Sequence, residues 1–188
     1  MNQTTKKTFT ILFAAILTIS IGSSIGLIPP ADAHDPPWSH PTYAFINVSP
    51  NPIGVGQMVY VNFWLQAPPP TARAGYGDKW TNMTVVVTKP DGTKETLGPF
   101  TSDDTGGTST RYTPSEVGEY TFQLVFLGEE LLGLNPRPGS RPSPYIGDYY
   151  EPSESNLFHL IVQEEPISHA PVIPLPTEYW KRPIYGQN

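Results

Sequence analysis

The sequence contains no cysteine, and this absence narrows the chemistry open to it. Among its 188 residues there is no thiol to form a disulfide, to act as a nucleophile or to bind zinc. The chain also has no run of basic residues, which argues against a nucleic-acid partner and against a polybasic membrane patch. Its net charge is −6, and we expect this acidity to serve solubility.

Motifs for catalysis are absent as well. The chain has no Gly-x-Ser-x-Gly nucleophile turn. The pairs Glu129-Glu130 and Glu164-Glu165 are poor acid–base dyads, because neighbours on a strand point to opposite faces. The pair Asp103-Asp104 begins a loop that could offer oxygens to calcium, but a solvated turn is the better interpretation. We therefore predict a non-enzymatic protein without a catalytic residue, a resident metal or a cofactor.

Proline and aromatic residues are abundant instead. The 23 prolines make up about 12% of the chain, against a usual share of ~5%. Long helices are disfavoured at this density, because a proline inside a helix costs roughly 3 kcal/mol. Four Trp, ten Tyr and eight Phe argue against a wholly disordered chain. The composition favours a β-rich domain with proline-containing loops.

The first 33 residues have the pattern of an export signal. Two lysines precede an uncharged stretch, 8–28, and Ala31-Asp32-Ala33 is a small-x-small cleavage pattern. Cleavage after Ala33 would make His34 the first residue of the mature protein. The alternative is an uncleaved membrane anchor, since about 20 apolar residues span a bilayer. Either way we expect the rest of the chain to be secreted or at the cell surface, with only this segment touching the membrane.

Short alternating segments follow, and their period of two predicts strands. The fold class we expect is all-β: an Ig-like β-sandwich of about seven antiparallel strands over residues 34–163, preceded by the signal-peptide helix and followed by a Pro-rich extended tail. Residues 128–155 interrupt the last two strands, and loops of this length are often functional. The seven expected strands are 42–48, 58–66, 82–89, 93–97, 108–113, 119–127 and 156–163.

Aromatic residues in the long loop and in the tail are candidates for partner contact. In the loop, Tyr145, Tyr149 and Tyr150 either contact a protein or glycan or pack the loop back onto the sandwich. Residues 164–188 hold five prolines and predict a semi-rigid linker. Tyr179 and Trp180 in this tail are expected to meet a partner surface.

Two sequons fit an extracellular location. Asn47-Val48-Ser49 and Asn82-Met83-Thr84 both match the N-glycosylation acceptor. Pro50 directly follows the first, so Asn82 is the better candidate for glycosylation.

Three segments together carry a resemblance to a known family. The runs 41–57, Val87-Thr-Lys-Pro-Asp-Gly-Thr93 and Pro114-Ser-Glu-Val-Gly-Glu-Tyr-Thr-Phe122 are similar to the N-terminal Ig-like domain of secreted archaeal proteins that continue into a PQQ-like β-propeller. Residues 174–184 resemble the joint that leads into the first blade. Only four residues follow Ile184, whereas a blade needs about 40. The resemblance therefore implies an accessory fold at the cell surface, but no quinone site.

Two functions are open at this point. The chain could be an accessory or adhesion-type module that contacts protein or glycan through its loops and tail. It could instead be a structural spacer for a propeller that is missing or encoded separately.

The histidines allow a third, remote reading. An N-terminal His34 would offer its α-amine and ring nitrogen to copper, with His40 or His159 as the second histidine and Asp35 as an axial oxygen donor. Copper oxygenases and copper carriers with Ig-like sandwiches use such a set. The sequence alone does not say whether either histidine pair binds copper.

Overall fold

The computed structural model describes residues 33–168. In this part of the chain there are twelve strands and no helix, so none that is long and apolar enough to cross a membrane. The predicted signal segment up to residue 32 lies outside the described residues. So does the tail from residue 169 onward, with Tyr179 and Trp180.

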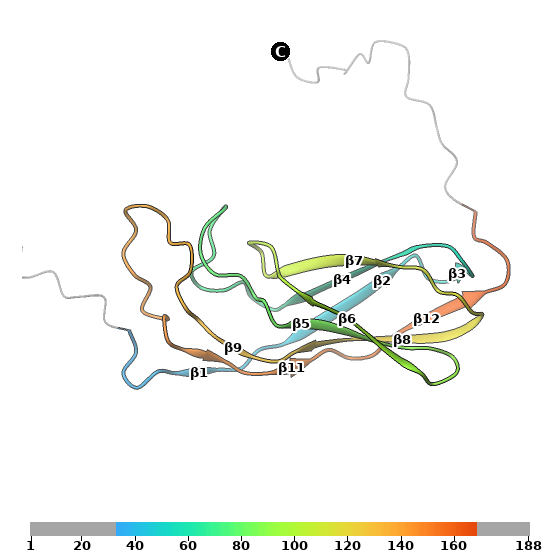
Figure 1. Ribbon diagram of the computed structural model, residues 1–188, viewed down its shortest axis with the longest axis horizontal. Helices are drawn as coiled ribbons and strands as arrows, with labels where there is room; N and C mark the ends of the chain where they lie inside the picture. The colour runs from blue at the N-terminus through green and yellow to red at the C-terminus, as the bar shows by residue number, and fades with distance from the viewer. Residues whose placement is uncertain (1–32, 169–188) are drawn as a thin grey trace, which may run out of the picture.

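Two larger sheets face one another in a sandwich-like arrangement (Figure 1). One sheet has the strand order β2-β4-β7, and the other has the order β3-β12-β8-β5-β6, with β11 also paired to β8. All of these pairs are antiparallel except β12 with β3. The strands are β2 (Ala44–Ser49), β3 (Ile53–Gly54), β4 (Val59–Leu65), β5 (Met83–Thr88), β6 (Lys94–Phe100), β7 (Gly107–Tyr112), β8 (Gly118–Phe126), β11 (Ser153–Glu154) and β12 (Phe158–Gln163).

The core lies between these two sheets, where alternate side chains of the strands meet. On β4 the inward residues are Val59, Val61, Phe63 and Leu65, each at most 2% exposed. The facing sheet contributes the alternating aromatic and leucine residues of β8, all fully buried. This period of two is what the sequence predicts, because successive side chains of a strand point to opposite faces.

The seven expected strands correspond to the seven that are six residues or longer, namely β2, β4, β5, β6, β7, β8 and β12. This confirms the all-β prediction. The five other strands have two residues each, which is too short for an alternating pattern to be visible in the sequence.

A third, small sheet caps one end of the sandwich. It consists of β1 (Ser39–His40), β10 (Tyr149–Tyr150) and β9 (Glu129–Glu130), in that order. β1 runs parallel to β10, and β9 runs antiparallel to it. The segment 128–155, which we expected to be a loop, therefore holds three short strands. Through β10 it is bound to the lead-in segment before β2.

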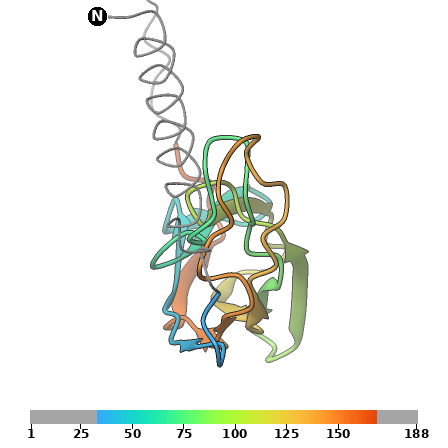
Figure 2. The ribbon, with the colours of Figure 1, turned by 90° about the vertical axis from the view of Figure 1, so that its left-hand side faces the viewer.

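Two long loops lie side by side at the same end (Figure 2). One connects β4 to β5, and the other connects β9 to β10. The backbone N–H of Gly77 donates to the carbonyl of Asn135 at 2.8 Å. The N–H of Leu134 donates to Oδ1 of Asp78 at 2.9 Å, and Asp78 is only 6% exposed. The two loops thus form one connected surface.

Candidate metal site

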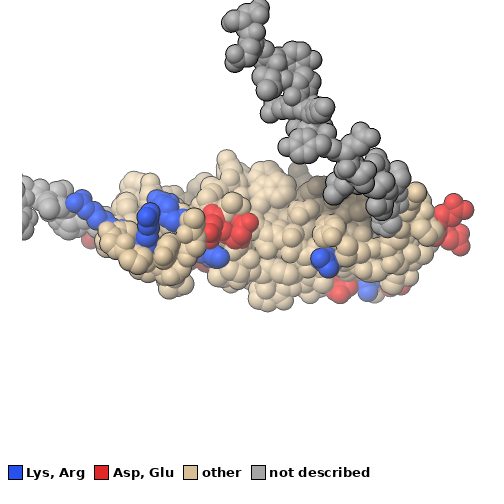
Figure 3. All heavy atoms as spheres, turned by 90° about the horizontal axis from the view of Figure 1, so that it is seen from above, with Lys and Arg blue, Asp and Glu red and all other residues tan. Residues whose placement is uncertain are grey.

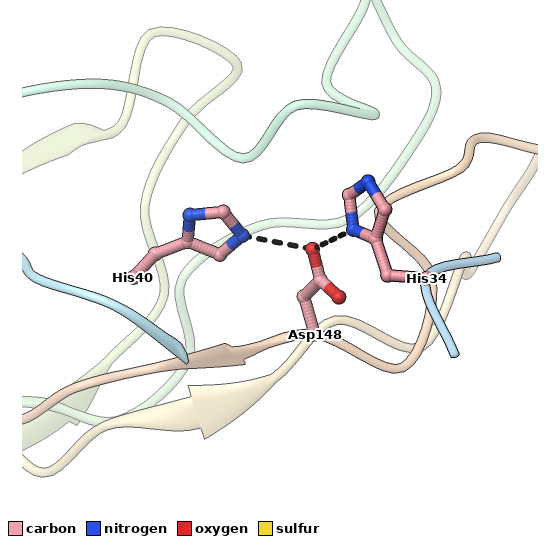
Figure 4. A group of neighbouring side chains, drawn as sticks. All are labelled: His34, His40 and Asp148. Atoms are coloured by element: carbon pink, nitrogen blue, oxygen red, sulfur yellow. Dashed lines mark hydrogen bonds and ion pairs between the residues drawn. The ribbon is translucent and has the colours of Figure 1, made fainter. Parts of the chain in front are cut away.

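Three side chains converge at the small sheet: His34, His40 and Asp148 (Figure 4). Nδ1 of His34 lies 2.7 Å from Oδ2 of Asp148, and Nε2 of His40 lies 2.8 Å from the same oxygen. One atom from each of the three residues lies within 4.8 Å of the other two. The carboxylate accepts from both rings, so each of these ring nitrogens carries a proton in this arrangement.

Local backbone structure sets this convergence. Prolines at 36, 37 and 41 keep the lead-in extended, because the ring fixes φ and removes a donor. The parallel register pairs His40 with Tyr150, so residue 148 comes level with residue 38. The backbone N–H of Tyr149 donates to the carbonyl of Trp38, and the N–H of Glu151 donates to the carbonyl of His40, both at 2.9 Å. The short ladder therefore brings the histidines to Asp148.

Asp148 is fully buried, and both oxygens of its carboxylate accept hydrogen bonds. Its Oδ1 accepts the backbone N–H of Trp38 at 2.9 Å, while Oδ2 accepts both histidines. Burial by itself raises the pKa of Asp148, but the bonds from His40, the Trp38 N–H and His34 outweigh it and lower the pKa to about 2. The group is therefore ionised at neutral pH.

Aromatic rings hold the two histidines in place. The ring of His34 stacks on that of Trp38, with centroids 3.6 Å apart and planes within 6°. The ring of His40 stacks on Tyr150 at 4.9 Å. Tyr145 meets both imidazoles edge-on, at 5.4 and 6.1 Å. Fixed rings favour binding of a ligand, because little side-chain freedom remains to be lost.

The site is connected to the main core on one side and open to solvent on the other. Tyr150 packs against the buried Trp80, whose ring also contacts Phe126 of β8. The side chains of His34 and His40 retain 18% and 25% of their exposure. A small ion or a water molecule can therefore reach the two histidines from solvent, while the carboxylate of Asp148 is buried beneath them.

The donor set is one that binds divalent transition metals. Neutral imidazole nitrogens and a carboxylate oxygen suit Zn²⁺, Cu²⁺ and Ni²⁺. The 2.7 and 2.8 Å contacts seen here have the length of charge-assisted hydrogen bonds. Metal binding would replace the two shared protons.

The structure separates the histidine candidates that the sequence left open. It brings His34 and His40 together on one carboxylate. His159 lies elsewhere, on the outward face of β12, where its Nδ1 pairs with Glu119. Asp35 is exposed and is not the carboxylate of the cluster.

Sequence reasoning missed Asp148, which is 108 residues from His40 and 114 from His34. Its one distinguishing feature in the sequence is that it stands among aromatic residues, before Tyr149-Tyr150. That pattern is too common to identify a ligand, and only the pairing of β1 with β10 makes the carboxylate part of the site.

The three tyrosines of the long loop divide by exposure. Tyr145 and Tyr149 are 37% and 43% exposed and remain open to a partner. Tyr150 is 8% exposed and packs the loop onto the sandwich. Ala33, the residue before the predicted cleavage point, is exposed.

Both predicted glycosylation residues lie within the described chain. Asn47 is exposed on the outer face of β2. Asn82 is half-buried, and its Nδ2 donates to the carbonyl of Gly128 at 3.2 Å. Asn82, which the sequence favours for glycosylation, is therefore the less exposed of the two asparagines, and its side chain is hydrogen-bonded.

The loop at Asp103 is a turn closed by its own hydrogen bonds. Oδ1 of Asp103 accepts the N–H and the hydroxyl of Thr105 at 2.8 and 2.6 Å, which lowers the pKa of that carboxyl. Oδ2 of Asp104 accepts the N–H of Gly75. These contacts agree with the interpretation as a solvated turn.

Comparison of the chain with protein-family models, with curated proteins and with solved structures finds no match in any of the three. The resemblance to a propeller-associated Ig-like domain stays a prediction from the sequence.

Proposed function

We propose that this chain is an exported, Ig-like β-sandwich protein that binds a divalent transition metal, copper(II) foremost, through His34, His40 and Asp148. The observation that carries the proposal is the meeting of two imidazoles on one buried, ionised carboxylate. The role we propose is binding rather than catalysis.

Copper(II) is favoured over the other divalent ions by affinity and by donor type. First-row metals bind nitrogen and oxygen sites in an order that peaks at Cu²⁺. Imidazole nitrogens with a carboxylate oxygen are the kind of nitrogen and oxygen donor set found in tetragonal Cu(II) sites.

The ring atom used by His34 also favours copper. Nδ1 is the ring nitrogen that can close a six-membered chelate with the α-amine of its own residue, and it is Nδ1 that faces Asp148. If export removes residues 1–33, His34 supplies that amine. His34 would then supply two nitrogen ligands to the copper, its α-amine and its Nδ1. His40 would add a third nitrogen, and Asp148 would add an oxygen.

Copper titration of the secreted protein tests the proposal. We expect one Cu(II) per chain, with nitrogen hyperfine structure in its electron paramagnetic resonance spectrum. His34→Ala, His40→Ala and Asp148→Asn should each weaken binding by about a hundredfold. His159→Ala is the matched control, because His159 is exposed and paired with a carboxylate outside the cluster; it should change the affinity by less than about twofold.

The outcome that contradicts the proposal is wild-type affinity in all three cluster variants, with far-UV circular dichroism showing that they are folded. Binding of Zn(II) alone would leave a metal site but overturn the choice of copper. Intact mass of the secreted form shows whether it begins at His34, and any other first residue removes the amine from the ligand set.

A second candidate function, attachment to a glycan, rests on the outer face of the β2-β4-β7 sheet. Tyr43, Phe45, Tyr60 and Trp64 are each 40–56% exposed there. The rings of Phe45 and Trp64 stack at 5.7 Å across the two strands. Aligned exposed rings offer flat faces to the C–H groups of a sugar, and exposed aromatic groups of this size mark interaction sites. A glycan-binding face of this kind fits the cell-surface module that the sequence predicts.

A further inference from the structure

A pocket of about 650 Å³ lies between the two long loops, and Tyr145 is one of its lining residues. Its volume falls within the range of small-ligand sites. Tyr145 belongs to the lining and also contacts His34 and His40. The carbonyl of Pro144, another lining residue, accepts the backbone N–H of His34.

Three arginines line this pocket, and no acidic residue does. They are Arg73, Arg137 and Arg141. Figure 3 shows basic side chains gathered at this end of the molecule. In residues 33–168, none of the arginines forms an ion pair with a carboxylate. Arg73 donates to the backbone carbonyls of Pro70 and Ala72. In a chain of net charge −6, a local excess of three positive charges without a carboxylate partner attracts an anion.

The rest of the lining is suited to a ring-shaped, hydroxylated ligand. Prolines 70, 136, 142 and 144, together with Ile146 and Tyr145, provide apolar surface. Ser140 and Ser143 add hydroxyls. Guanidinium groups match carboxylates in two-point hydrogen bonds, while proline and tyrosine rings can stack against the face of a sugar.

The pocket is organised before any ligand arrives. Asp78 accepts the hydroxyl of Thr71 at 2.5 Å and the N–H of Leu134 at 2.9 Å, and so holds both walls together. The N–H of Asp78 in turn donates to Thr71 Oγ1 at 3.0 Å. A preformed pocket loses less entropy when it binds.

We infer that this pocket binds an acidic sugar of the uronic-acid class, with its carboxylate on the arginines and its ring against Tyr145 and the prolines. The inference does not require the metal site. It adds a ligand-binding site to the proposed function.

Calorimetric titration of the secreted protein with digalacturonate tests the inference. Arg137→Gln and Arg141→Gln should each weaken binding about tenfold. Both side chains are exposed in a loop, so the fold should be unaffected. Lys94→Gln is the matched control: Lys94 is exposed at the start of β6, in the other large sheet from the exposed aromatic face and outside the pocket, and its loss should leave the affinity unchanged.

Three further probes separate the alternatives. A neutral disaccharide, cellobiose, should bind at least about tenfold more weakly than digalacturonate; equal binding would overturn the role of charge. If inorganic phosphate or sulfate binds as tightly as digalacturonate, the proposed specificity for a sugar is overturned and the pocket is a general oxyanion site. Unchanged affinity in both arginine variants, or no binding of digalacturonate, would overturn the inference. Repeating the titration with the wild-type protein in the presence and in the absence of Cu(II) should give the same affinity, so this result stands apart from that of the copper experiment.

Discussion

Asp148 shows how much one buried charge depends on its neighbours. Removing a carboxylate from water costs several kcal/mol, and this cost is offset only where hydrogen bonds satisfy the group. Here both oxygens are satisfied, by His34 and His40 on one side and by the Trp38 N–H on the other. The same contacts fix the lead-in segment to the long loop, so that this cluster contributes to the fold.

Tyr112 gives a prediction of pH dependence at the same scale. Burial, followed by the nearby carboxylate of Glu95, raises the pKa of Tyr112 well above its usual value of about 10. The folded state therefore favours the neutral hydroxyl. Its contribution to stability is complete below pH ~10 and is lost as the pH rises above that value.

We expect the free energy of unfolding to fall steeply above pH ~10 in the wild type and less steeply in Tyr112→Phe. Phe keeps the ring contacts with Tyr120 and Phe122. Urea denaturation between pH 8 and pH 11 measures the two slopes. Parallel curves for the two proteins would show that Tyr112 is not a cause of the loss.

At the scale of elements, the loop between β4 and β5 depends on two glycines that share a backbone conformation but not an environment. Gly75 and Gly77 have φ of +76° and +84°. A Cβ on Gly75 would meet nothing within 4 Å, whereas one on Gly77 would collide with the carbonyl of Thr71. Only at Gly77 do two backbone segments approach each other closely.

This pair predicts a difference in stability. Gly75→Ala should cost about 1 kcal/mol, because a left-handed conformation is strained for any side chain, and should lower the melting temperature by roughly 3 °C. Gly77→Ala should cost at least ~2 kcal/mol more, because the overlap forces the backbone to move. Differential scanning calorimetry of both variants measures this. Equal losses would mean that the contact of Gly77 with Thr71 does not constrain the loop.

The long strands could be predicted from the sequence, and the short ones could not. An alternating pattern needs about four residues to be recognised, and segments such as Val59–Leu65 and Gly118–Phe126 supply it. β1 and β10 have two residues each and pair across more than a hundred positions. His34 and His40 could be selected as candidate ligands from the predicted cleavage point, but their carboxylate depends on that distant pairing.

For the whole molecule, the outer face of the β2-β4-β7 sheet and the cap with the proposed metal site are separate surfaces, so binding at one should survive loss of the other. We expect Phe45→Ser combined with Trp64→Ser to reduce retention of the protein on an insoluble polysaccharide about tenfold, with copper affinity unchanged. The matched control is Leu127→Ser, which removes a 60% exposed apolar side chain that follows β8. Equal retention of the double variant and the wild type would contradict a glycan role for this face.

The ends of the described chain lie at opposite ends of the long axis, with β1 at one and the end of β12 at the other (Figure 1). Tension applied between them would run nearly along the strands. β12 resists through a ladder of five residue pairs with β8. β1 has two pairs with β10, one hydrogen bond from Ser39 to Glu151 and the bond from His40 to Asp148. The first seam to slip under load would be the one at His34, His40 and Asp148. If the proposed ion binds there, it would add coordination bonds across that seam, and the force at which this seam opens would rise with metal occupancy.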